Sequence, residues 1–189
     1  MPVELESKKK AIAQLIDGDV VDESDRVAVC IRGHVNGYRA TMEAVVPGWP
    51  FGVIYTVESV AGIDPAAPYI KPTARITLYP RVGRGMAGFL TNILLFESNT
   101  MRVDNKDLES VFNFTYDDKE MAHRFCNWPG VAERLLHLED VAKFSEVVVR
   151  TDAGIYLSQP KSFNSLDLDL CQETFESLAD IAGILAEHF

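Results

Sequence analysis

The sequence predicts an α+β protein, in which helices pack on an antiparallel sheet. Two observations favour this class: strand-like runs near the N-terminus are joined by tight turns, and the later runs do not alternate regularly as βαβ units. The chain has 189 residues, 47% hydrophobic and 24% charged. That composition supports a sizeable core and excludes a disordered or collagen-like protein. We expect one globular domain over residues 1–189, or two lobes, a sheet-rich one at 20–100 and a β-α-α-β-β-α unit at 105–189.

The N-terminal half is predicted to be a helix followed by a meander. Apolar side chains spaced like one helix face predict a helix over 5–16, which ends at Asp17-Gly18. The acidic residues that follow predict a solvated connector. Runs rich in β-branched and aromatic residues predict strands at 26–32, 38–46, 51–59 and 73–79. Asn36-Gly37 favours a type I′ turn between the first two of these strands.

The C-terminal half contains both helix-like and strand-like spacing of apolar residues. Apolar residues between Met86 and Phe96 recur at helical spacing and predict a buried helix. After a polar bend, alternating aromatic residues predict a half-buried strand at 111–116. Asp117, three residues before Glu120, predicts the N-cap of the next helix. The remaining elements expected are a helix ending near 126, a helix at 131–138, strands at 144–150 and 155–158, and a helix at about 170–188.

Charge is unevenly distributed along the chain. With 18 basic and 28 acidic residues the net charge is −10, which argues against a nucleic-acid partner. No acidic residue occurs between Asp64 and Glu97, however. This stretch supplies the candidate residues for binding an anion or a partner: Lys71, Arg75, Arg81, Gly83, Arg84 and Gly85. Arginine near a helix N-terminus suits a phosphate or a carboxylate. Alternatively, these cations pair with acidic side chains elsewhere in the fold.

A glycine-rich motif gives a second hypothesis. Gly83–Gly88 reads G-x-G-x-x-G, between a predicted strand and a predicted helix, and Asp104 lies 21 residues beyond Gly83. This pattern predicts a small enzyme acting on a nucleotide or phosphorylated ligand, with Arg84 at the phosphate and Asp104 or Asp107 at the sugar or acting as the base. A Rossmann domain needs more parallel strands than this chain offers. A glycine-rich turn leading into a buried helix is therefore the simpler interpretation, and no cofactor is expected.

The sequence gives little indication of a metal site or of a reactive-cysteine motif. His123 and Cys126 are three residues apart on a predicted helix, but a closed zinc site needs four ligands, so no metal is expected. Cys30, Cys126 and Cys171 form no CxxC motif and leave one cysteine unpaired, which favours a reducing compartment. With no secretory signal pattern and no apolar run long enough to cross a bilayer, we expect a soluble cytoplasmic protein.

One set of known proteins shares the order of these elements. The chain has Gly37-Tyr38-Arg39, the strand Ala74 to Tyr79, then Val111 to Asp118 followed by Ala122 and the helix Val131 to Leu138. In this order it resembles a set of uncharacterised bacterial proteins in which a sheet domain ends in an F-x-V/F-x-x-D strand, a helix, a hairpin and a helix. The likeness covers roughly the last four-fifths of the chain. Many such proteins have membrane-spanning segments ahead of this domain, which this sequence lacks, and the resemblance implies no reaction or site.

These observations favour a non-catalytic binding or regulatory module. We expect it to use a sheet edge or the basic segment from Lys71 to Arg84 to hold an acidic protein partner or a small anion. The nucleotide enzyme is one alternative. The other is a peripheral membrane protein, with the helix at 86–96 in the interface and the arginines at the headgroups.

Overall fold

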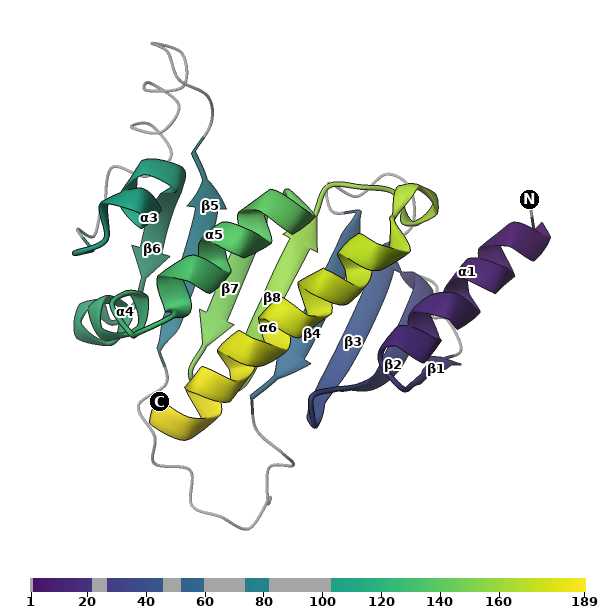
Figure 1. Cartoon of the computed structure of the whole chain (residues 1–189), viewed down its shortest axis with the longest axis horizontal. Coiled ribbons are helices and arrows are strands. Elements are labelled where there is room, and N and C mark those ends of the chain that lie inside the picture. Colours follow the sequence, from purple (N-terminus) through teal and green to yellow (C-terminus); the bar gives the residue numbers. More distant parts are fainter. Residues whose placement is uncertain (1, 22–26, 46–51, 60–73, 82–102) are drawn as a thin grey trace.

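A computed structural model describes residues 2–21, 27–45, 52–59, 74–81 and 103–189. Eight strands form one antiparallel sheet in the order β1-β2-β3-β4-β8-β7-β5-β6 (Figure 1). The strands are β1 Asp19–Val21, β2 Val27–Val35, β3 Tyr38–Val45, β4 Val53–Glu58, β5 Arg75–Pro80, β6 Phe112–Tyr116, β7 Glu146–Arg150 and β8 Gly154–Gln159. The helices are α1 Pro2–Leu15, α3 Lys106–Val111, α4 Lys119–Cys126, α5 Val131–Ala142 and α6 Leu168–His188, with a short 3-10 turn, η1, at Phe163–Ser165. The predicted α+β class is confirmed.

Local turn chemistry and long-range pairing together build the sheet. Asn36 and Gly37 have φ angles of 51° and 85°, so both central residues of the β2–β3 turn adopt the positive φ that a type I′ turn requires. The β2-β3-β4 meander continues into the C-terminal half because β4 pairs with β8, from Val53 opposite Gln159 to Glu58 opposite Gly154. The predicted C-terminal β-α-α-β-β-α order is present as β6, α4, α5, β7, β8 and α6.

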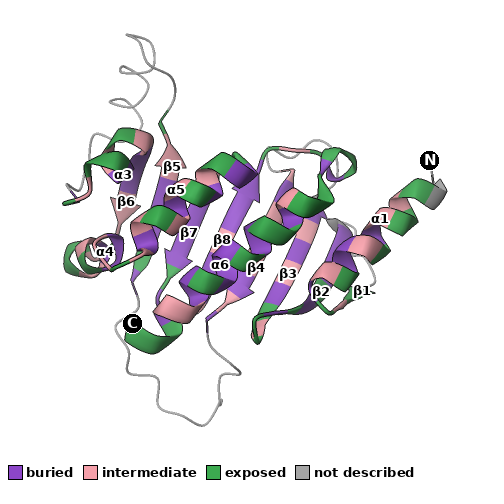
Figure 2. Ribbon diagram, viewed as in Figure 1, coloured by how far each residue is buried: buried purple, intermediate pink, exposed green. Residues whose placement is uncertain are grey.

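The helices α1, α5 and α6 lie on one face of the sheet (Figure 1). Their sheet-facing sides are buried and their outer sides exposed (Figure 2). The α6 helix contributes the longest apolar stripe, in which Phe175 packs edge-on against Tyr55 of β4 with ring centroids 5.1 Å apart. Phe112 of β6 stacks on Phe144 at 5.7 Å. Because this face is covered, the side chains that alternate with the core residues lie on the far face of the sheet.

Three local predictions differ from the structure. The predicted solvated connector contains β1, which is held by its pairing with β2 although its three residues are too few to show an alternating pattern. The predicted polar bend contains α3, whose only buried residue is Leu108 and which therefore has no helical periodicity. The next helix, α4, is capped by Asp118, whose carboxylate accepts the Met121 N–H at 2.9 Å. Asp117, the predicted cap, accepts the backbone N–H of Arg75 instead.

Candidate functional site

The predicted basic segment is described only in part. Lys71, Gly83, Arg84 and Gly85 lie outside the described residues, as do the rest of the Gly83–Gly88 motif and the predicted helix at 86–96. Arg75 begins β5 and Arg81 directly follows its last residue. At about 3.3 Å per residue, the two ends of this strand are about 17 Å apart. Arg75 and Arg81 therefore do not form one compact patch.

The two arginines have different surroundings. The backbone N–H of Arg81 donates to the Val111 carbonyl at 2.7 Å, and its Nε donates to the Phe112 carbonyl at 3.1 Å. Arg81 thus helps to join the ends of β5 and β6. Arg75 is exposed, whereas its neighbour Ile76 is fully buried in the core. Because side chains alternate along a strand, the Arg75 side chain lies on the far face of the sheet.

Arg75 belongs to a row of residues that crosses the far face. The strand register places His34 opposite Arg39, Glu58 opposite Gly154, Gly154 opposite Arg150, and Arg150 opposite Arg75. Arg39 and Glu58 are neighbours across β3 and β4, with Nη1 3.5 Å from Oε2. We call His34, Arg39, Arg150 and Arg75 the arginine row; all four are exposed. At about 4.8 Å per strand, the row is about 24 Å long.

Within the described residues, each arginine of the row has a carboxylate nearby. Arg39 pairs with Glu58, and both side chains are substantially exposed, at 61% and 39%. Arg150 donates to both carboxylate oxygens of Asp152, at 3.1 and 2.7 Å. Asp117 lies beside Arg75, since its carboxylate accepts the Arg75 backbone N–H at 2.7 Å. Three arginines beside three carboxylates leave the row without net charge when His34 is neutral. The chain as a whole has a net charge of −10.

A polar hollow of about 740 Å³ adjoins one end of the arginine row. Its lining residues come from the α1–β1 turn and from strands β1 to β4: Asp17, Gly18, Asp19, Arg32, Gly33, His34, Arg39, Thr41, Glu43, Thr56 and Glu58. The hollow shares His34 and Arg39 with the row and adds Arg32, which lies opposite Thr41 in the register. The far face of this part of the sheet is thus exposed, polar and indented.

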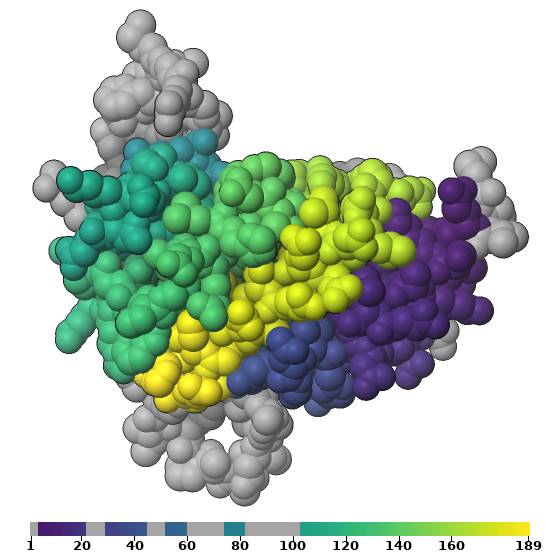
Figure 3. Space-filling view, viewed as in Figure 1, coloured from purple at the N-terminus to yellow at the C-terminus, as the bar shows by residue number. Residues whose placement is uncertain are grey.

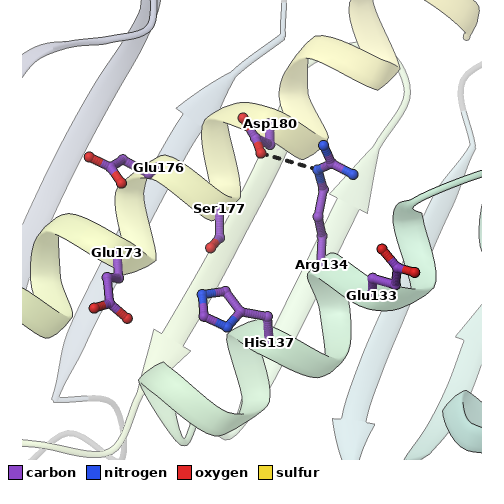
Figure 4. A pocket seen from close by; sticks show the side chains of 7 residues that line it. All are labelled: Glu133, Arg134, His137, Glu173, Glu176, Ser177 and Asp180. Atoms are coloured by element: carbon purple, nitrogen blue, oxygen red, sulfur yellow. Dashed lines mark hydrogen bonds and ion pairs between the residues drawn. The ribbon is translucent and has the colours of Figure 1, made fainter.

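A second hollow, of about 410 Å³, lies on the opposite side of the molecule between α5 and α6. These helices lie side by side at the surface of the helical face (Figure 3). We call this hollow the α5–α6 groove; its lining residues are Glu133, Arg134, His137, Glu173, Glu176, Ser177 and Asp180 (Figure 4). The Nε of Arg134 donates to Asp180 Oδ2 at 3.2 Å across the groove.

The two faces differ in charge. Together α5 and α6 contain eight acidic residues and one arginine, so these helices alone carry −7 when their histidines are neutral. The eight strands contain four arginines and four acidic residues, and therefore have no net charge. These two helices on the helical face thus carry −7, compared with −10 for the whole chain.

Burial makes the cysteine thiols poor nucleophiles. Cys30, Cys126 and Cys171 are free and buried, and burial raises the pKa of each thiol, in the case of Cys126 to about 12. All three therefore remain protonated at neutral pH, whereas nucleophilic cysteines need a thiolate. These thiols give no support to cysteine-based catalysis.

The Cys126 thiol is expected to make the protein sensitive to alkali. Its folded pKa of about 12 exceeds the ordinary value of 9.0, so the unfolded state loses this proton first as the pH rises. The free energy of unfolding should fall above about pH 9, by about 2–3 kcal/mol at about pH 11 from this group alone. Urea titrations at about pH 9 and about pH 11 measure this decrease in the free energy of unfolding. It should be smaller for Cys126→Ala than for the unmodified protein. Equal decreases for the two proteins would contradict the assignment.

The histidine and acidic candidates do not converge on a metal site. His123 Nε2 lies 3.7 Å from Asp104 Oδ2, and the Asn127 amide donates to the His123 ring. Cys126 is 1% exposed, buried in the core. In the described ranges, no three His, Cys, Asp or Glu side chains are grouped as around a metal ion. Asp107, the other acidic candidate, is exposed in the first turn of α3.

Comparison with protein-family models, curated proteins and solved structures gives no match for this chain. None of the helices within the described ranges combines the length and apolarity needed to cross a bilayer. The arginine row, the adjoining hollow and the α5–α6 groove are the candidate binding surfaces of the described residues. Arg75 was identified from the sequence, whereas Arg39 and Arg150 were not. The register of the sheet places Arg150 directly opposite Arg75, and it places Arg39 in the same row four strands away.

Proposed function

We propose that the protein is a non-catalytic binding module that holds an acidic protein surface against the arginine row. The observation that carries this proposal is the register, which aligns exposed basic side chains from four strands across one sheet face. Guanidinium groups bind carboxylates through paired hydrogen bonds. A row about 24 Å long exceeds the reach of one small anion, so an extended acidic partner fits better than a small ligand.

The ion pairs within the row are weak enough for a partner's carboxylate to replace one of the row's own carboxylates. An exposed pair such as Arg39–Glu58, at 3.5 Å, contributes only about 0–1 kcal/mol to stability. A partner carboxylate can therefore replace Glu58 at little cost. The adjoining hollow provides Arg32, Thr41 and Thr56 as further hydrogen-bonding groups, beside the acidic side chains of Asp17, Asp19, Glu43 and Glu58. The row thus combines guanidinium groups that can pair with carboxylates and polar groups for specificity.

The predicted basic segment contributes one residue to the row. Arg75, the only residue of the predicted basic segment that is part of the row, begins β5. Three free cysteines fit a reducing compartment, and we place the interaction in the cytoplasm.

A fluorescein-labelled octaglutamate peptide tests the proposal, because eight extended residues span about 26 Å. Fluorescence anisotropy measures its binding to the whole chain at low salt. We expect Arg39→Ala/Arg75→Ala to weaken binding about tenfold. The matched control is Lys106→Ala/Lys119→Ala, which removes the same charge from α3 and α4. Equal weakening in both double variants, or no binding by the unmodified chain, would refute the proposal.

A further inference from the structure

We infer that the α5–α6 groove is a separate binding site for the basic side chains of a protein segment. The groove lies on the helical face, whereas the arginine row lies on the far face of the sheet. The inference is therefore independent of the proposed function. Four features of the groove support it: its charge, its unpaired acceptors, a buried hydroxyl group and an arginine already bound within it.

The groove combines negative charge with acceptors that are not otherwise used. Among the residues that the structure describes, Glu173 and His137 have no hydrogen-bond or ion-pair partner. Glu176 accepts a hydrogen bond from the Gln172 amide at 2.8 Å. It forms no ion pair with any of the residues that the structure describes. Carboxylates accept hydrogen bonds only, and a neutral imidazole has one accepting nitrogen. A ligand with several N–H donors and a positive charge would satisfy this set.

Ser177 marks the floor of the groove. The residue is only 8% exposed, and within the described residues its hydroxyl has no hydrogen-bond partner. In the described ranges, every side-chain N or O atom that is fully inaccessible has a hydrogen-bond partner. The Ser177 hydroxyl has none, so its oxygen is accessible, and we assign this access to the groove that Ser177 lines. Ser177 and His137 point toward one another, with Glu173 beside them (Figure 4). A buried hydroxyl that opens into a hollow gains a hydrogen bond when a donor enters.

Arg134 shows that a guanidinium group fits between these helices. Its Nε donates to Asp180 Oδ2 at 3.2 Å, and its Nη1 donates to the Gly130 carbonyl at 3.2 Å. The helices run antiparallel, so His137, one turn further along α5, faces Ser177, about one turn earlier on α6. The group of Glu173, Ser177 and His137 therefore offers a second guanidinium a position like that of Arg134 beside Asp180.

The extent of the charge favours a protein segment over a small cation. The 21 residues of α6 span about 31 Å and include five acidic residues but no lysine or arginine. A single small cation would use only the groove. A segment with several arginines would also meet acidic side chains along the helix. Arginine suits the site better than lysine, because its planar group offers five N–H donors.

The experiment uses a fluorescein-labelled peptide of alternating arginine and serine, and the same peptide with citrulline in place of arginine. Anisotropy with the full chain should show binding of the arginine peptide and at least about tenfold weaker binding of the citrulline peptide. Glu173→Gln should weaken binding about fivefold, whereas Glu187→Gln, which makes the same charge change outside the groove, should change it less than about twofold. Ser177→Ala, which alters no charge, should weaken binding about threefold.

Several outcomes would overturn the inference. Equal effects of Glu173→Gln and Glu187→Gln would show attraction to the acidic surface as a whole. Equal binding of the citrulline peptide would remove the role of charge, and unchanged binding by Ser177→Ala would remove the site itself. Self-association that Glu173→Gln abolishes, measured by sedimentation, would assign the groove to a second copy of the chain. Arg39→Ala/Arg75→Ala should leave arginine-peptide binding undiminished, which separates this result from the test of the arginine row.

Discussion

Replacing Gly154 with alanine is expected to lower the free energy of unfolding by about 4 kcal/mol, which is a large part of the roughly 5–15 kcal/mol by which folded domains are stable. Gly154 is the first residue of β8 and has a φ of 138°, a conformation that residues with a side chain rarely adopt. An added Cβ would lie 2.2 Å from the Val57 carbonyl oxygen and 2.8 Å from the Glu58 Cα. Both are backbone atoms of β4, so the clash cannot be relieved by rotating a side chain.

The position of Gly154 makes the effect global. It lies where β4 pairs with β8, the contact that joins the N-terminal meander to the C-terminal strands. Separating these strands would break the sheet at its middle and disrupt the arginine row, since Glu58 and Arg150 both lie opposite Gly154.

Gly37→Ala is the matched control. Gly37 also has a positive φ, 85°, but an added Cβ there would meet nothing within 4 Å. It should therefore cost only about 1 kcal/mol, from the backbone conformation alone. Urea unfolding followed by circular dichroism measures both variants. Similar midpoints for Gly154→Ala and Gly37→Ala would show that the close approach of β8 to β4 is not tight.

Local signals in the sequence predicted the elements that depend on local chemistry. The Asn36-Gly37 turn, the apolar stripe of α6 and the alternation in β6 are all encoded within a few neighbouring residues. The two elements that were missed have no apolar pattern of their own. The β1 strand exists because β2 offers it an unpaired edge, and α3 is begun by the Asn105 side chain, which caps the N–H of Leu108. Neither signal appears as periodicity.

The candidate sites were less accessible to prediction because their residues come together only through contacts between distant parts of the sequence. Arg39, Arg150 and Arg75 are far apart in the sequence. They form a row only because two hairpins and two long-range pairings, β4 with β8 and β5 with β7, set their register. Likewise, the α5–α6 groove requires the packing of two helices separated by a hairpin. The negative charge of α6 could be read from the sequence, but the sequence did not show that Ser177 would face His137.

Replacing Gln159 with leucine is expected to lower the free energy of unfolding by about 4 kcal/mol, because it removes a buried side chain that hydrogen-bonds two other buried groups. Gln159 is 3% exposed at the end of β8. Its carbonyl oxygen accepts a hydrogen bond from the Tyr55 hydroxyl at 3.2 Å, and its amide donates to the Ala142 carbonyl at the end of α5. Burial raises the pKa of Tyr55, so this hydroxyl remains a neutral donor at neutral pH. Leucine would leave the hydroxyl with only the Cys171 sulfur, at 3.4 Å, and the carbonyl with no side-chain partner.

A double-mutant cycle separates the hydrogen bonds from packing. Tyr55→Phe alone removes the donor and leaves the Gln159 carbonyl oxygen unpaired, at a cost of about 1–2 kcal/mol. If the two side chains act as one chain, Tyr55→Phe/Gln159→Leu should be less destabilised than the sum of the single variants by about 1 kcal/mol or more. Additive losses in urea unfolding would mean that Gln159 acts only through its contact with Ala142. A coupled result would show that the Tyr55–Gln159 hydrogen bond stabilises the pairing of β4 with β8, which joins the two halves of the sheet.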